Sequence, residues 1–192
     1  MTWKDIPGWM DFESYYRSVV ECYSGGDLVE VGCYLGRSLC FLGQLVRDSG
    51  KPFRVWGVDW CLGSGVENGN DNHANAMKEN GGSLAGKLHR NVCDCGLQDI
   101  VSLVVAESGR AAQLFADNSL TLVFLDARHE YADVCRDIEL WSPKVRLGGE
   151  IGGDDYGIKD EAPVWPGVRR AVDEMLPGRE LVPHDAWKWR KR

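Results

Sequence analysis

Short apolar runs that alternate with amphipathic stretches are the feature that most constrains how this chain folds. The expected strands lie at 28–31, 53–58, 101–106, 120–125 and 150–152. Helical spacing falls mainly at 37–46, 109–115, 131–141 and 168–176, and two final β-type runs at 180–182 and 186–189 predict an antiparallel pair. Strands that alternate with helices are typical of βαβ units, in which helices cover both faces of a parallel sheet. The sequence therefore predicts a doubly wound α/β fold with a mostly parallel sheet of seven strands.

Acidic residues occur where these apolar strands run out. Glu30 lies near the end of the first strand, Asp59 follows the second, Asp126 follows the fourth, and Asp154 and Asp155 follow the fifth. In an open parallel sheet, ligands bind at the carboxyl ends of the strands. We therefore expect these carboxylates to converge on one crevice, which becomes the candidate active site.

The length of the chain fits one domain with a sizeable core. A chain of 192 residues with 44% hydrophobic content suits one α/β domain, so we expect 1–192 to form a single unit. Segment 1–26 is expected to be a helical lead-in that covers the sheet, because aromatic and apolar residues recur at helical spacing from Trp9 to Tyr23. Segment 61–86 is rich in Gly, Asn and Ser, which predicts a lid or substrate loop with a helical part near 74–79.

Charge and composition exclude several classes of partner. A net charge of -7 argues against binding to nucleic acid or to anionic membranes, and the basic stretch 188–192 is too short to change this expectation. No run reaches the roughly 18 apolar residues of a membrane span, and the first residues do not open a signal peptide, so we expect a cytoplasmic protein. Seven scattered cysteines predict free thiols, with a zinc site at Cys93, Cys95 and His89 as the weaker alternative.

The segment 30–38 has the composition of a ligand-binding loop between a strand and a helix. Gly32 and Gly36 allow a tight turn and a close approach of the backbone, and Ser38 lies near the helix start. The spacing differs from the G-x-G-x-x-G pattern that binds dinucleotides, and Glu30 before the glycines favours a cationic group. Asp59 is placed to accept hydrogen bonds from two ribose hydroxyls. A ligand that carries both an amino group and a ribose satisfies both expectations.

From Asp27 to Trp189 the chain resembles the class I S-adenosylmethionine-dependent methyltransferases, which have a Rossmann-like fold. The resemblance is closest to the metal-dependent O-methyltransferases of the catechol type and of the macrocin type, which acts on sugars. In the catechol type the first loop reads acid-x-Gly-x-Tyr-x-Gly-x-Ser, and the matching residues are Glu30, Gly32, Tyr34, Gly36 and Ser38. The resemblance implies that this loop holds the methionine end of S-adenosylmethionine.

The same resemblance assigns the nucleoside end of the cofactor. Asp59 takes the place of the acid that binds the ribose, and Ser108 takes the place of the serine beside the adenine. Trp60 is expected either to pack against the adenine ring or to be a tryptophan of the core.

Acids in the family's metal positions are Asp126, Asp154 and Asp155, and three oxygen ligands from two strand ends suit Mg²⁺. Asp126 is also expected to lie nearest the sulfonium of the cofactor. The alternative is that one of the three acids caps a following helix. His129 takes the place of the catalytic base of the macrocin type, with a surface histidine at a helix start as the alternative. His73 and His184 are expected to be solvated.

The expected activity is transfer of a methyl group to a hydroxyl of a small molecule, with a divalent metal orienting the acceptor. A histidine where the catechol type has lysine favours a vicinal diol such as a sugar. The chain does not show the long N-terminal extension of macrocin-type enzymes, which leaves open the acceptor and whether the chain forms a homo-oligomer. Two alternatives are a metal-independent small-molecule methyltransferase and a non-catalytic module that only binds S-adenosylmethionine.

Overall fold

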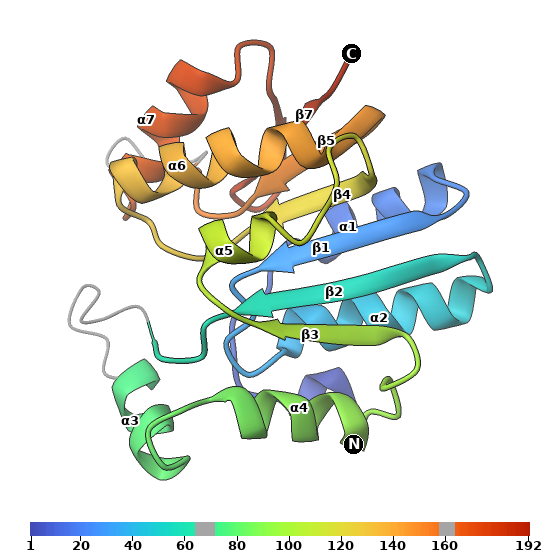
Figure 1. The fold of residues 1–192 in the computed structure, drawn as a ribbon, viewed down its shortest axis with the longest axis vertical. Helices are drawn as coiled ribbons and strands as arrows, with labels where there is room; N and C mark the ends of the chain where they lie inside the picture. Colours follow the sequence, from blue (N-terminus) through green and yellow to red (C-terminus); the bar gives the residue numbers. More distant parts are fainter. Residues whose placement is uncertain (64–71, 158–163) are drawn as a thin grey trace.

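The computed structural model describes residues 1–63, 72–157 and 164–192. Across these residues the strands form a seven-stranded sheet of order β3-β2-β1-β4-β5-β7-β6 (Figure 1). The strands are β1 Gly26–Val31, β2 Phe53–Asp59, β3 Val101–Val105, β4 Leu120–Leu125, β5 Val145–Gly153, β6 Glu180–Val182 and β7 Ala186–Arg190. The first five strands pair in parallel, whereas β7 pairs antiparallel with both β5 and β6. The predicted α/β class, the mostly parallel sheet and the antiparallel C-terminal pair are confirmed.

Helices cover both faces of the sheet, as the alternation of elements predicts (Figure 1). They are α1 Glu13–Cys22, α2 Arg37–Ser49, α3 Asn72–Glu79, α4 Ala85–Asp94, α5 Ser108–Ala112, α6 Tyr131–Trp141 and α7 Pro166–Met175, with short 3₁₀ turns at Trp3–Asp5 and Ser142–Lys144. Side chains from α1, α2 and α4 form one core cluster with one face of the sheet. Side chains from α5, α6 and α7 form a second cluster with the other face.

The central strand β4 has a continuous apolar sequence because helices cover both of its faces. All of its residues are buried. Leu122 and Phe124 belong to the core cluster on the α1 and α2 side, whereas Val123 and Leu125 belong to the cluster on the α6 and α7 side. Successive side chains of a strand point to opposite faces, so a strand covered on both faces must be apolar throughout.

The N-terminal segment is less helical than predicted. Helix α1 begins only at Glu13, and residues 6–12 are not helical because Pro7 and Gly8, with its φ of +147°, interrupt the chain. Trp9 therefore lies outside the helix, and 57% of its surface is exposed. The assignment of Trp9 to the apolar face of a lead-in helix is wrong.

Other expectations have mixed outcomes. The helical part expected near 74–79 is confirmed by α3. The rest of the expected lid, 64–71, lies outside the described residues. Strand β5 begins five residues earlier than predicted, at Val145, and α4 was not located from the sequence.

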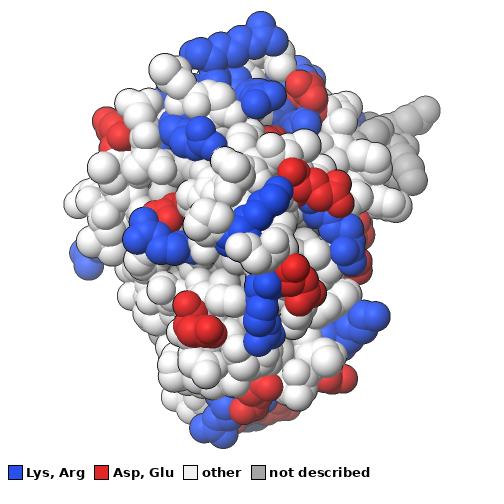
Figure 2. Space-filling view, turned by 90° about the vertical axis from the view of Figure 1, so that its right-hand side faces the viewer, with Lys and Arg blue, Asp and Glu red and all other residues white. Residues whose placement is uncertain are grey.

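Within the described parts of the chain, no helix is both long and apolar enough to cross a membrane. On the face shown in Figure 2, Lys and Arg side chains are interspersed with Asp and Glu.

Candidate active site

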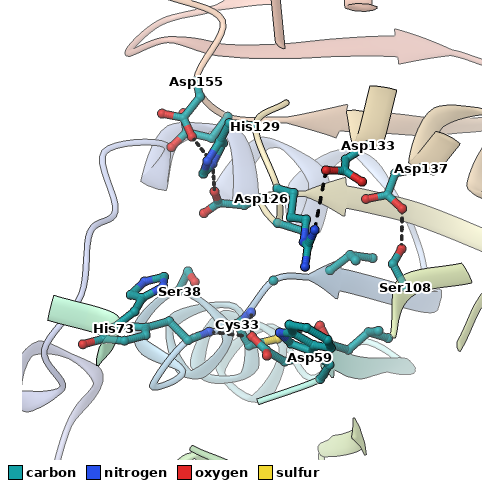
Figure 3. Close-up of a pocket in the computed structure, with 18 of the residues that line it drawn as sticks. Cys33, Ser38, Asp59, His73, Ser108, Asp126, His129, Asp133, Asp137 and Asp155 are labelled. Atoms are coloured by element: carbon teal, nitrogen blue, oxygen red, sulfur yellow. Dashed lines mark hydrogen bonds and ion pairs between the residues drawn. The ribbon is translucent and has the colours of Figure 1, made fainter. Parts of the chain in front are cut away.

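A cavity of about 790 Å³ opens at the carboxyl ends of the parallel strands (Figure 3). Among the acids that line it are the four expected at strand ends: Asp59 at the end of β2, Asp126 after β4, and Asp154 and Asp155 after β5. These acids come from strands that are separated by up to about a hundred residues of sequence, and the parallel order of the sheet places them on one edge. The expected convergence of these carboxylates is confirmed for the four acids that follow the strands.

Glu30 is the exception, because its side chain lies beneath the loop and does not line the cavity. It is fully buried and accepts hydrogen bonds from the hydroxyls of Tyr16 at 2.7 Å and Ser38 at 2.7 Å. Burial raises the pKa of Glu30 to about 8, and the two hydroxyl donors lower it only in part. Glu30 therefore links α1, β1 and the start of α2 from inside the core.

Asp59 holds the backbone of the glycine loop. Its Oδ2 accepts hydrogen bonds from the backbone N–H groups of Cys33 at 2.7 Å and Tyr34 at 2.9 Å, and its Oδ1 accepts one from Cys61 at 2.6 Å. A carboxylate offers about four lone-pair sites, two on each oxygen, so Oδ2 is fully used by the loop whereas Oδ1 retains capacity for one ribose hydroxyl. The same acid can therefore shape the loop and bind a ligand.

The glycine loop approaches the end of β4 closely. Gly32 has a φ of +91°, and a Cβ atom there would collide with the carbonyl oxygen of Asp126. Tyr34 also adopts a left-handed backbone, with a φ of +49°, which is uncommon for a residue other than glycine. Gly32, Tyr34 and Ser38 line the cavity, whereas Gly36 lies outside its wall, at the start of α2.

Ser108, at the first position of α5, lines the far end of the cavity together with Asp137 of α6. The Ser108 hydroxyl donates to Asp137 Oδ1 at 2.6 Å and accepts from the Trp141 indole at 2.9 Å. Burial raises the pKa of Asp137 to about 6. Sequence reasoning missed Asp137, although an acid between Val134 and Trp141 on the apolar face of the predicted helix was a usable signal.

Trp60 also lines the cavity. Its side chain is 38% exposed and its indole donates to the carbonyl oxygen of Gly63 at 2.7 Å. The guanidinium of Arg128 lies 5.3 Å from the centre of the indole ring. The alternative of a purely buried Trp60 is therefore wrong.

Asp126, His129 and Asp155 form a compact group at the opposite end (Figure 3). One ligand atom from each lies within 4.8 Å of the others. His129 Nε2 is 2.8 Å from Asp155 Oδ2 and 3.8 Å from Asp126 Oδ1, and the imidazole stacks on Trp165 with ring centres 4.4 Å apart. The His129 side chain is only 14% exposed, so the alternative of a surface histidine is wrong.

Asp154 adds a third, largely buried carboxyl next to this group. Its Oδ1 is buried without a hydrogen-bond partner among the described residues. Burial, followed by the charges of Asp126 and Asp155, raises the pKa of Asp154 to about 9, and burial likewise raises the pKa of Asp126. The caps of α6 and α7 are Glu130 and Trp165, so none of the three acids caps a following helix. The carboxylate oxygens of these acids and the imidazole of His129 are ligand types that bind divalent cations.

Three aromatic rings, those of Trp9, Tyr34 and His73, also line the cavity, and sequence reasoning missed their arrangement. Tyr34 stacks on His73 with ring centres 4.6 Å apart, and Trp9 lies 5.6 Å from Tyr34. His73 is half-buried, so the expectation of a solvated histidine is wrong there, whereas His184 is exposed as expected. The pair Pro7-Gly8 was the signal that Trp9 leaves the helix.

The cysteines do not contribute a second group of this kind. All seven are free thiols, and Cys93 and His89 lie 3.8 Å apart on α4 without joining any group of metal ligands among the described residues. The zinc alternative is therefore not supported by the geometry.

Comparisons with known proteins assign most of the chain to one family. The model of a family described as "Methyltransferase domain" matches residues 29–156. An uncharacterized protein of Acanthamoeba polyphaga mimivirus is 26% identical over 153 residues, which cover 79% of this chain and 61% of that protein. The chain thus matches less than two thirds of the length of that relative.

Solved structures show the same fold at low sequence identity. The O-methyltransferase NovP superimposes with a TM-score of 0.68 at 21% identity, covering 93% of this chain and 78% of NovP. CalS11, described as a TDP-rhamnose 3'-O-methyltransferase of calicheamicin biosynthesis, has a TM-score of 0.57 at 18% identity, covering 93% of this chain and 76% of CalS11.

Proposed function

This chain belongs to the methyltransferase-domain family, and we propose that it transfers the methyl group of S-adenosylmethionine to a hydroxyl oxygen of a small molecule. The observation that supports this acceptor chemistry best is the contact between His129 and Asp155 beside Asp126, at the end of the cavity opposite Ser108. This arrangement supplies a base and a site of high negative charge where an acceptor hydroxyl would lie.

The cofactor is proposed to lie along the carboxyl edge of the sheet. The loop with Gly32 and Tyr34 faces the methionine portion, Oδ1 of Asp59 accepts a ribose hydroxyl, and Ser108 marks the adenine end. Asp126 lies where the glycine loop meets the end of β4, nearest the expected sulfonium. This placement leaves the space between Tyr34 and His129 for the acceptor.

The acceptor is proposed to be a vicinal diol, such as a sugar. Two aromatic walls face this space, one formed by Trp9, Tyr34 and His73 and the other by His129 and Trp165. Aromatic faces pack well against the apolar face of a sugar or against another flat ring. A sugar is favoured because His129 occupies the position of the base in sugar-modifying enzymes that the sequence resembles, and because CalS11 shares this fold.

Proton transfer is assigned to His129. Asp155 orients the imidazole and stabilises its protonated form, and stacking on Trp165 fixes the plane of the ring. The acceptor O–H gives its proton to the imidazole, while the oxygen forms a bond to the methyl carbon of S-adenosylmethionine. The carbon–sulfur bond breaks and its electron pair remains on sulfur, which leaves S-adenosylhomocysteine and the methylated acceptor. His129 then releases the proton to solvent.

Asp126, Asp154 and Asp155 are proposed to hold a divalent metal ion, with Mg²⁺ the expected one. When bound, such an ion orients two adjacent oxygens of the acceptor and lowers the pKa of one hydroxyl. The buried, unpaired Oδ1 of Asp154 and the raised pKa of that carboxyl support this proposal, since a cation would remove both costs.

A screen of hydroxyl acceptors tests the function as a whole. We would supply S-adenosylmethionine with a labelled methyl group to panels of nucleotide sugars, free sugars and catechols, with Mg²⁺ or with EDTA. Labelled product that requires Mg²⁺ supports the proposal. Equal turnover in EDTA would indicate a metal-independent methyltransferase, and cofactor binding without turnover on any acceptor would indicate a non-catalytic module.

Metal binding is tested separately with Mn²⁺ as the probe, followed by electron paramagnetic resonance. Asp126→Asn, Asp154→Asn and Asp155→Asn should each weaken Mn²⁺ binding at least about tenfold, which corresponds to about 1.4 kcal/mol. Glu139→Gln, which removes an exposed carboxylate of α6, is the matched control and should not change it. Unchanged Mn²⁺ affinity in all three aspartate variants would rule out the site.

A further inference from the structure

We propose that Asp137 selects the adenine base of the cofactor by accepting a hydrogen bond from its exocyclic amino group. The inference rests on the cofactor placement proposed above, in which Ser108 marks the adenine end of the cavity. It assigns the recognition of the base to a residue of α6 that lies outside the loops at the carboxyl ends of the strands.

The hydroxyl of Ser108 is already committed to other protein groups. Its proton goes to Asp137 Oδ1 over 2.6 Å, and one lone pair accepts the Trp141 indole N–H over 2.9 Å. A hydroxyl has one proton to donate and two lone pairs, so Ser108 can offer the base only its remaining lone pair. Ser108 therefore acts mainly by orienting Asp137.

Asp137 has an oxygen left for a ligand. Its side chain is 8% exposed and lines the cavity, and among the described residues no hydrogen-bond donor reaches Oδ2. Figure 3 shows this second oxygen turned away from Ser108. The guanidinium of Arg136, the residue before Asp137, forms an ion pair with Glu107 at 3.3 Å and not with this oxygen. A carboxylate oxygen that faces the cavity without a protein donor favours a ligand that brings one.

The chemistry of the base fits this oxygen. The 6-amino group of adenine donates a hydrogen bond, whereas the 6-oxo group of hypoxanthine only accepts one. A site built to pair with a donor rejects an analogue that lacks it, because the buried acceptor is then left unpaired. Burial raises the pKa of Asp137 to about 6, so the carboxylate is ionised, and accepts only, at pH 8.

The test compares S-adenosylhomocysteine and S-inosylhomocysteine by calorimetry at pH 8; the two ligands differ at the 6-position and at N1, which accepts in adenine and donates in hypoxanthine. The wild-type protein should bind the adenosyl compound at least about tenfold more tightly. In Asp137→Asn the amide can still accept from Ser108 while its NH₂ group donates to the 6-oxo group. This variant should therefore weaken the adenosyl ligand, strengthen the inosyl ligand and abolish or reverse the preference.

Matched controls separate recognition from a structural role. Glu139→Gln removes an exposed carboxylate two residues further along α6 and should keep the wild-type preference. Should Asp137→Asn fail to fold, the wild-type comparison still decides, because equal affinity for the two ligands overturns the proposal. A folded Asp137→Asn protein with the wild-type preference also overturns it and leaves Asp137 as a structural tie between α5 and α6. If neither ligand binds the wild-type protein, the proposed function itself fails.

Discussion

Replacing Glu30 with glutamine should change how the stability of the folded protein depends on pH. The carboxyl is fully buried, and its pKa rises from the ordinary 4.5 to about 8. At 1.36 kcal/mol for each pKa unit, ionising this group in the folded state costs up to about 5 kcal/mol more than in the unfolded chain. Because the folded pKa is raised, the contribution of Glu30 to the free energy of unfolding should be most favourable below about pH 4.5 and should fall as the pH rises to about 8.

Glutamine has the same shape and can still accept a hydrogen bond from Tyr16 or Ser38, but it cannot ionise. The measurement is urea unfolding of both proteins, without ligand, at intervals from pH 5 to pH 8.5. The difference in unfolding free energy between Glu30→Gln and the wild type should move in favour of the variant by several kcal/mol across this range. Taking the difference removes the contributions of the other carboxyls that have a raised pKa.

Glu21→Gln is the matched control, because it removes an exposed carboxylate from α1, the helix that carries Tyr16. Its stability should follow the wild-type pH profile. Parallel profiles for Glu30→Gln and the wild type would refute the reasoning, since they would mean that Glu30 ionises in the core at no greater cost than in water.

Three further predictions concern the site. His129→Ala should lower kcat by roughly 10²- to 10⁴-fold with little change in cofactor affinity, and His129→Lys should recover part of the loss; a fully active alanine variant would show that the hydroxyl proton passes directly to water. Gly32→Ala should abolish binding of S-adenosylmethionine in calorimetry, because its Cβ would meet the carbonyl oxygen of Asp126. The control is Gly50→Ala, at a positive φ with open space around it, which should lower stability but still bind S-adenosylmethionine. Cofactor binding by Gly32→Ala would contradict the geometry. Trp9→Ala should raise the KM for the acceptor while the cofactor Kd stays constant, and an unchanged KM would exclude Trp9 from the acceptor wall.

The fold and the edge of the sheet that carries the site could be read from the sequence because both depend on local patterns. Apolar runs of strand length between helical stretches are sufficient to predict a parallel sheet. An acid at the end of such a run must lie at the carboxyl edge, whatever the packing of the helices. Asp59, Asp126, Asp154 and Asp155 were predicted correctly on this basis and line the cavity.

The partners of the site residues depend on packing between distant segments, which no local pattern encodes. Strand periodicity places Glu30 on the same face as Leu28, but only the packing of α1 onto that face brings the Tyr16 hydroxyl to its carboxylate. The Ser108–Asp137 hydrogen bond joins residues 29 positions apart and forms because α5 packs on α6. The strand ends therefore set where a ligand binds, whereas the packing of helices against the sheet sets which carboxylates are buried, paired or left for the ligand.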